Sequence, residues 1–201
     1  MAQPARLEDR EQIREVLFRY SRGIDRRDVD LLRSCYHADS IDQRPSFSGT
    51  GHAFAEYAIS EVSDAVFTQH IISNILIEFN NKQAFCECYV LAIHRFETEE
   101  RMVDFTHYGR YCDIFEFRDD SWKIAFRLHI PDANQVTPVT ELGGKKRKDV
   151  ADDAAVAIRG EPHPSDASYR RFSVSALRRD IPTRTGMFRE RVAAWLDAIP
   201  N

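Results

Sequence analysis

The spacing of hydrophobic residues changes from helical to extended about one third of the way along the chain. Over residues 8–23 the apolar side chains fall on one helical stripe, with Arg and Glu on the opposite face. The stripe consists of Ile13, Val16, Leu17, Tyr20 and Ile24. Gly23 supplies a stop for this helix. Asp28 or Asp30 caps a short second helix, and a third is predicted over residues 51–66.

From residue 69 onward apolar and polar residues alternate, which is the pattern of β-strands. The predicted strands cover residues 69–79, 84–96, 102–118 and 121–130. Short polar connections between them, such as ETEE, are typical of hairpin loops. The turn-rich stretch 37–49 is expected to hold a short strand. Helices first and an antiparallel meander second predict an α+β domain, with three helices packed on one face of a curved, cone-shaped sheet that encloses a pocket.

The last part of the chain has a different character. Several prolines, a Gly143-Gly144 pair and the basic run 145–148 predict an irregular segment. We therefore divide the chain into an α+β domain, residues 1–136, and a C-terminal extension, residues 137–201, with a short helix near 185–198. The basic run is interpreted as a solvated charge run rather than a nucleic-acid or membrane patch.

Composition narrows the class of protein. With 201 residues and 43% hydrophobic content the chain can bury one good core. A formal charge of −4 argues against a nucleic-acid partner. No apolar run approaches the ~20 residues that cross a bilayer, and the charged N-terminus does not resemble a secretory signal. A cytoplasmic protein is predicted.

The four cysteines, Cys35, Cys86, Cys88 and Cys112, show no metal-ligand spacing. Cys86 and Cys88 alternate along a strand, which places both thiols on one face. Buried free thiols are expected rather than a disulfide or a metal pair.

Strand alternation gathers polar residues on one face of the predicted sheet. If the ETEE hairpin pairs Glu97 with Met102, then His94 faces Phe105 and Ala92 faces His107. Small residues then lie beside large polar ones, as in a sheet that lines a cavity. The polar side chains assigned to this face on the four strands are His70, Asn74, His94, His107, Tyr111, Arg127 and His129.

Four of the seven histidines therefore fall on compatible positions of consecutive strands. A single histidine on a strand is more often structural, so the clustering carries the functional interpretation. Histidine and carboxylate are common metal ligands, but the chain has no H-x-H, H-E-x-x-H or C-x-x-C spacing. No metal and no other cofactor is predicted.

Two segments carry a resemblance to a known family. The sequence YSRGIDRRD at residues 20–28, followed by CYHAD, resembles the start of a SnoaL-like domain of the nuclear transport factor 2-like superfamily. The run GRYCDIFEFRDDSWKI at residues 109–124 resembles its end. The resemblance covers roughly residues 7–135, and the C-terminal extension has no counterpart in it.

The resemblance suggests particular site residues. Enzymatic relatives such as scytalone dehydratase, the hexachlorocyclohexane dehydrochlorinase and the bile-acid 7α-dehydratase share an Asp after the first helix and a His on the first long strand. Asp25 and His70 stand at these positions. His94 stands where scytalone dehydratase places a second catalytic histidine, and Tyr20 and Arg127 stand at pocket positions of related enzymes.

These residues suit proton-transfer chemistry. Asp25 would orient His70, which would remove a proton as a general base. His94, His107 or Tyr111 would protonate the leaving oxygen, and Arg127 would hold an anionic oxygen. Two structural alternatives stay open: Asp25 as a turn cap, and Arg127 in a salt bridge with Asp113 or Glu116.

The function predicted from these observations is a cofactor-independent, dehydratase-like lyase acting on a small aromatic or alicyclic compound, with a place in aromatic compound catabolism. The alternatives are a retro-aldol formaldehyde lyase acting on a phenolic propanoid, a ketosteroid-type isomerase, and a non-catalytic binding domain such as an oxygenase small subunit. A homodimer or homotrimer is expected through the outer face of the sheet. That face carries Tyr89, Leu91, Ile93 and Tyr108.

Overall fold

The computed structural model describes residues 6–139, 162–165 and 167–170. Residue contacts divide the chain into two units, Met1–Pro138 and Val139–Asn201. In the second unit one short 3₁₀ helix is described, Ala167–Arg170. The basic run at 145–148 and the helix predicted near 185–198 lie outside the described residues. All of the predicted site residues lie in the first unit.

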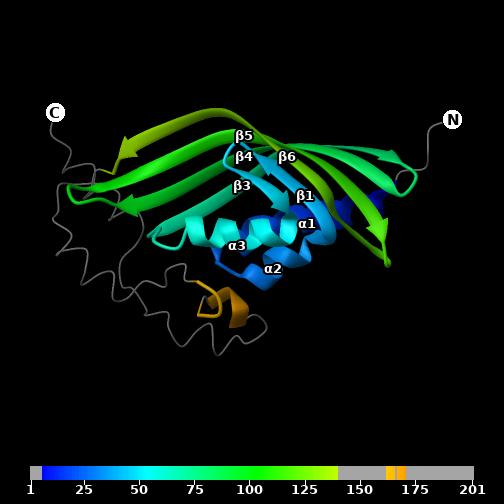
Figure 1. Ribbon diagram of the computed structural model, residues 1–201, viewed down its shortest axis with the longest axis horizontal. Helices are drawn as coiled ribbons and strands as arrows, with labels where there is room; N and C mark the ends of the chain where they lie inside the picture. Colours follow the sequence, from blue (N-terminus) through cyan, green and yellow to red (C-terminus); the bar gives the residue numbers. More distant parts are fainter. Residues whose placement is uncertain (1–5, 140–161, 166, 171–201) are drawn as a thin grey trace, which may run out of the picture. The chain divides into compact units, whose positions relative to one another are not determined.

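The first unit is an α+β domain, as the hydrophobic pattern predicts. Its elements are α1 (Leu7–Asp25), α2 (Val29–Ser34), β1 (Tyr36–Arg44), β2 (Phe47–Thr50), α3 (Gly51–Glu61), β3 (Phe67–Asn80), β4 (Gln83–Glu97), β5 (Met102–Arg118) and β6 (Ser121–Pro138). The strands form one sheet in the order β2-β1-β6-β5-β4-β3. β1 pairs with β6 in parallel, and all other pairs are antiparallel. The sheet is curved, and the three helices cover one of its faces (Figure 1).

The helices follow local sequence signals, with two corrections. The predicted stripe of α1 is buried, and Asp28 caps α2 by accepting a hydrogen bond from the Leu31 backbone N–H. Gly23 does not stop α1, which continues to Asp25. A Cβ at Gly23 would lie 3.0 Å from Leu32 of α2, so the glycine allows the close approach of the two helices. The third helix ends at Glu61, earlier than predicted.

The register predicted from the ETEE hairpin is confirmed. Glu97 pairs with Met102, His94 with Phe105 and Ala92 with His107. The expected alternation along β3 is wrong beyond Ser73, because a β-bulge there shifts the register before Leu76.

Asn74 occupies this bulge with a φ of 51°, in the left-handed region that asparagine tolerates better than most residues. The shift turns Ile77 into the core, where it is 3% exposed, and leaves Leu76 55% exposed. Asn74 is consequently an exposed residue outside the cavity.

The core lies between α1, α3 and the concave face of the sheet. Its largest fully buried side chains include Trp122, Tyr20, Tyr36 and Phe115. All four cysteines are free, as predicted; Cys35, Cys86 and Cys88 are buried, and Cys112 is partly exposed.

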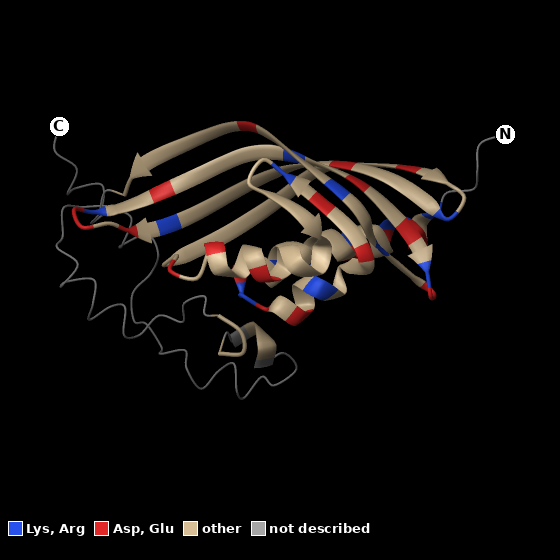
Figure 2. Cartoon of the chain, viewed as in Figure 1, with Lys and Arg blue, Asp and Glu red and all other residues tan. Residues whose placement is uncertain are grey.

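Lys and Arg are interspersed with Asp and Glu along the strands and helices in the view of Figure 2. Among the described residues, no helix has the length and apolar character needed to cross a membrane.

Candidate active site

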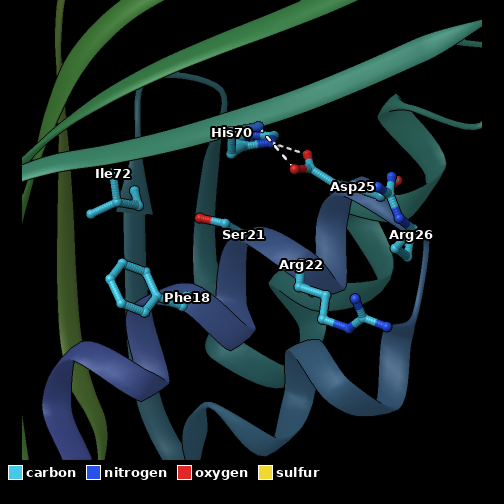
Figure 3. Close-up of a pocket in the computed structure, with 7 residues that line it drawn as sticks. All are labelled: Phe18, Ser21, Arg22, Asp25, Arg26, His70 and Ile72. Atoms are coloured by element: carbon cyan, nitrogen blue, oxygen red, sulfur yellow. Dashed lines mark hydrogen bonds and ion pairs between the residues drawn. The ribbon is translucent and has the colours of Figure 1, made fainter. Parts of the chain in front are cut away.

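An Asp–His pair joins the end of α1 to the edge strand β3. The Asp25 carboxylate accepts the Nδ1–H of His70 at 2.7 Å and the backbone N–H of the same residue at 2.9 Å (Figure 3). The side chains are only 13% and 6% exposed. With Nδ1 donating to the carboxylate, the neutral imidazole keeps its lone pair on Nε2. The turn-cap alternative for Asp25 is not what the structure shows, because this carboxylate is directed at His70.

His94 lies beside this pair. Its ring centroid is 5.3 Å from that of His70, and its Nδ1 lies 3.0 Å from Thr68 Oγ1. The Thr68 hydroxyl also reaches Asp25 Oδ1 at 3.5 Å, so Thr68 bridges His94 to the carboxylate. Burial, followed by the neighbouring His70 and His107, lowers the pKa of His94 from 6.5 to about 4. His94 is therefore uncharged at neutral pH.

A second imidazole pair spans β5 and β6. His107 Nε2 lies 2.7 Å from His129 Nε2, and His107 Nδ1 lies 2.6 Å from Asn134 Oδ1. The space for this contact depends on Gly109, because a Cβ there would lie 2.7 Å from His107 Nε2 and 3.1 Å from His129 Nε2. Burial and the nearby charges of Arg44, His107 and Arg127 lower the pKa of His129 to about 3.

The two histidine groups flank one small residue. His70 pairs with Ala92 across β3 and β4, and Ala92 pairs with His107 across β4 and β5. Neighbouring strands are about 4.8 Å apart, so the backbones of His70 and His107 are separated by roughly 10 Å. The short side chain of Ala92 leaves this interval open on the cavity side.

A cavity of about 230 Å³ extends over this row between the sheet and α3. Its lining includes aromatic and aliphatic side chains from α3 and the sheet, together with the polar groups Arg44, Ser46, Glu61, His70, His94, His107, Tyr111 and His129. A second hollow of about 250 Å³ lies between α1 and the edge strand, lined by Phe18, Ser21, Arg22, Asp25, Arg26, His70 and Ile72 (Figure 3). His70 borders both spaces.

Arg44, at the end of β1, is a cavity residue that the sequence analysis did not identify. Its Nε and Nη2 atoms donate to the Asp42 carboxylate, and Nη2 also donates to Tyr20 Oη at 2.8 Å. Its guanidinium carbon lies 3.6 Å from the centroid of the Phe54 ring. The Tyr36 hydroxyl donates to Asp42 at 2.6 Å. Tyr20 is fully buried and acts as a support for Arg44 rather than as part of the cavity wall.

Arg127 lies beneath the cavity. It donates from Nε and Nη2 to both oxygens of Asp113, at 2.7 and 2.6 Å, and both residues are 0% exposed. Its guanidinium carbon lies 4.2 Å from the Tyr20 ring centroid and 4.0 Å from that of Tyr111. The salt-bridge alternative is the observed one, and the expectation that Arg127 contacts substrate is corrected.

The structure thus brings together most of the predicted site residues. The cavity or the second hollow is lined by Asp25, His70, His94, His107, Tyr111 and His129. The cavity lining does not include Tyr20, Asn74 or Arg127. Burial raises the pKa of Tyr111 well above its ordinary value, so its hydroxyl stays protonated. Within the described part of the chain, no group of three or more His, Cys, Asp or Glu residues is arranged to hold a metal ion.

Comparison with known proteins agrees with this architecture. A structure from Streptomyces avermitilis, described as a candidate dehydratase of the NTF2-like family, has a similar fold (14% identity, covering 63% of this chain and 98% of that chain, TM-score 0.53). A family model described as the SnoaL-like domain matches residues 5–128, and the chain belongs to this family.

Other solved structures resemble the chain more closely in sequence. A protein described as a candidate scytalone dehydratase from Novosphingobium aromaticivorans is 28% identical, with 67% of this chain and 91% of that chain covered and a TM-score of 0.59. A hexachlorocyclohexane dehydrochlorinase, LinA type 2, is 21% identical, with coverage of 67% and 91% and a TM-score of 0.58. A search of curated proteins found no match.

Proposed function

We propose that this protein is a cofactor-independent lyase in which His70 is the general base and Asp25 its orienting carboxylate. The observation that carries the proposal is the double hydrogen bond from His70 to Asp25, with His70 in the lining of the cavity. The carboxylate fixes the imidazole tautomer and stabilises the imidazolium that forms when Nε2 accepts a proton. The dehydratase and dehydrochlorinase structures among the neighbours support a reaction of the elimination type.

The reaction we infer is a β-elimination. His70 Nε2 takes a proton from carbon, the C–H electron pair forms the new C=C bond, and the adjacent C–O or C–X bond breaks with its electrons on the leaving group. A leaving hydroxyl must be protonated as it departs. We infer that this proton returns from the His70 imidazolium, and that His94, whose ring centroid is 5.3 Å from that of His70, and the protonated Tyr111 hydroxyl hydrogen-bond the departing oxygen.

The cavity favours a small ring compound. Its volume of about 230 Å³ is below the usual range for drug-sized ligands, and Phe54, Tyr57 and Phe105 supply flat apolar walls. A small aromatic or alicyclic alcohol or halide fits these walls and the elimination chemistry.

Two substitutions test the base assignment. His70→Gln and Asp25→Asn are assayed against hydroxylated and halogenated ring compounds, with product alkene followed by absorbance and mass spectrometry. Proton abstraction is measured separately, as exchange of substrate C–H for deuterium in D₂O by NMR. We expect each variant to lose ~10²- to 10⁴-fold in turnover and exchange. His52→Gln on α3 and Asp64→Asn, an exposed residue, are the matched controls.

Measurements of folding and of product binding show whether a loss of turnover comes from the chemistry alone. Both variants should retain cooperative unfolding and should bind product with the affinity of the unmodified protein. Unchanged turnover and exchange in both variants would show that His70 and Asp25 are not the acid–base pair.

A further inference from the structure

Among the described residues that line the cavity between the sheet and α3, Arg44 alone carries a guanidinium. Two of its three nitrogens are held by Asp42 and Tyr20, whereas Nη1 has no hydrogen-bond partner among the described residues. The Arg44 side chain is 9% exposed and its position is fixed by the Asp42 fork and the Phe54 ring. A donor held this rigidly is paired with little loss of entropy when a ligand supplies an acceptor.

The surroundings of Arg44 favour a negatively charged acceptor. The Asp42 carboxylate is already shared between Arg44 and the Tyr36 hydroxyl, and Asp25 is occupied by His70. The carboxylate that does belong to the described lining, that of Glu61, is exposed at the end of α3. Hydrogen bonds from a guanidinium to an ionised oxygen are roughly twice as strong as neutral ones, and more so away from water.

Arg44 and His70 stand at opposite ends of the cavity wall. In the sheet order Arg44 belongs to β1 and His70 to β3, with β6, β5 and β4 between them. The sheet is curved (Figure 1), and Arg44 and His70 both line the one cavity. A ligand oxygen on Arg44 would therefore leave the rest of a small ring extended over Ala92 toward His70.

We propose that Arg44 forms a subsite for an acidic oxygen, and that the ligands of this cavity are small ring compounds bearing a carboxylate or a phenolate. The inference rests on the proposed function in one respect, since it places the ligand in the same cavity as the base. It assigns to Arg44 the anion-binding role that the sequence pattern suggested for Arg127. During turnover the same contact stabilises negative charge that develops on the ring substituent.

The first experiment uses the unmodified chain and two isosteric probes. Binding of benzoate and of benzamide is measured by calorimetry. We expect benzoate to bind at least ~10-fold more tightly, because its hydrogen bond to Arg44 is charge-assisted and that of benzamide is not. 4-Nitrophenol is a third probe, because its ionised form absorbs at longer wavelength than its neutral form. We expect the bound phenol to show the ionised spectrum at pH values where the free phenol is neutral.

Substitutions of Arg44 then test whether this residue causes the preference for benzoate. Arg44→Gln should abolish the preference for benzoate and the ionised spectrum, with benzamide affinity unchanged, and Arg44→Lys should retain part of both. Arg33→Gln, which removes a surface arginine paired with Glu56, is the matched control. Equal binding of benzoate and benzamide by the unmodified protein, or no binding of either, would overturn the proposal even if Arg44→Gln does not fold.

The base assignment is tested independently in the same assay. His70→Gln should bind benzoate as the unmodified protein does while losing turnover. Retained turnover in His70→Gln with an intact benzoate preference contradicts the lyase mechanism and leaves the Arg44 subsite standing. Lost turnover without any benzoate preference contradicts the subsite alone.

Discussion

Arg127 should govern stability rather than ligand binding. Its guanidinium and the Asp113 carboxylate are both 0% exposed and form two parallel hydrogen bonds, of 2.7 and 2.6 Å. The Tyr20 and Tyr111 rings lie within 4.2 Å of the guanidinium carbon. Replacing Arg127 with Met keeps the hydrophobic volume and leaves the carboxylate buried without its partner. Breaking a buried pair in this way costs about 3–5 kcal/mol of unfolding free energy.

The loss should depend on pH. Burial already raises the pKa of Asp113 above 3.8, against the opposing effect of Arg127. Without Arg127 the pKa rises further, so the folded variant keeps a proton that the unfolded chain releases. The unfolded state then binds fewer protons, and stability falls as pH rises above about 4, with a slope of up to about 1.4 kcal/mol per pH unit. The deficit of Arg127→Met should therefore be smallest in acid.

The free energy of unfolding is measured at each pH of a series by urea unfolding, followed by tryptophan fluorescence. Arg127→Met, Asp113→Leu and the double variant are compared with the unmodified chain. The double variant should recover much of the loss and lack the added slope, because no unpaired charge remains. A deficit below about 1 kcal/mol for Arg127→Met at neutral pH, or a double variant no more stable than the weaker single one, would refute the reasoning.

Three further predictions follow from the site and the sheet. Gly109→Ala should separate His107 from His129, cost about 1–3 kcal/mol of stability and shift the NMR signals of both imidazoles; unchanged signals would contradict the steric argument. His94, with its pKa lowered to about 4, binds a proton less readily than in the unfolded chain, so the free energy of unfolding should fall by up to about 3 kcal/mol as pH drops from 6.5 to 4. In denaturant titrations over that range, the free energy of unfolding of His94→Asn should fall less. Tyr108, 41% exposed on the outer face, is proposed as part of a homo-oligomer interface; Tyr108→Glu should reduce the mass measured by light scattering, and an unchanged mass would exclude this interface.

The local hydrophobic pattern predicted the order of helices and strands and most of the residues that surround the cavity. The change of period placed the helices before the meander, and the loop ETEE set the register that puts His94 opposite Phe105. The pattern did not predict features that depend on contacts between segments far apart in the chain or on a break in strand alternation. The bulge at Asn74 is invisible to strict alternation, and the parallel pairing of β1 with β6 joins segments far apart in the chain. Arg44 was missed for this reason, because its own stretch predicts turns and a short strand but not the strand with which that strand pairs.

The histidines around the cavity differ in the groups that surround their rings. Asp25 accepts a hydrogen bond from His70 Nδ1 at 2.7 Å, which fixes the tautomer of this ring and leaves Nε2 to accept a proton. Burial keeps His94 neutral, and burial together with the guanidinium of Arg44 keeps His129 neutral, with pKa values of about 4 and 3. A neutral imidazole can orient an oxygen by hydrogen bonding but seldom carries a proton to it at neutral pH. In the proposed mechanism, the proton that His70 removes is therefore the one returned to the leaving group, and His94 hydrogen-bonds that group rather than acting as a second proton carrier.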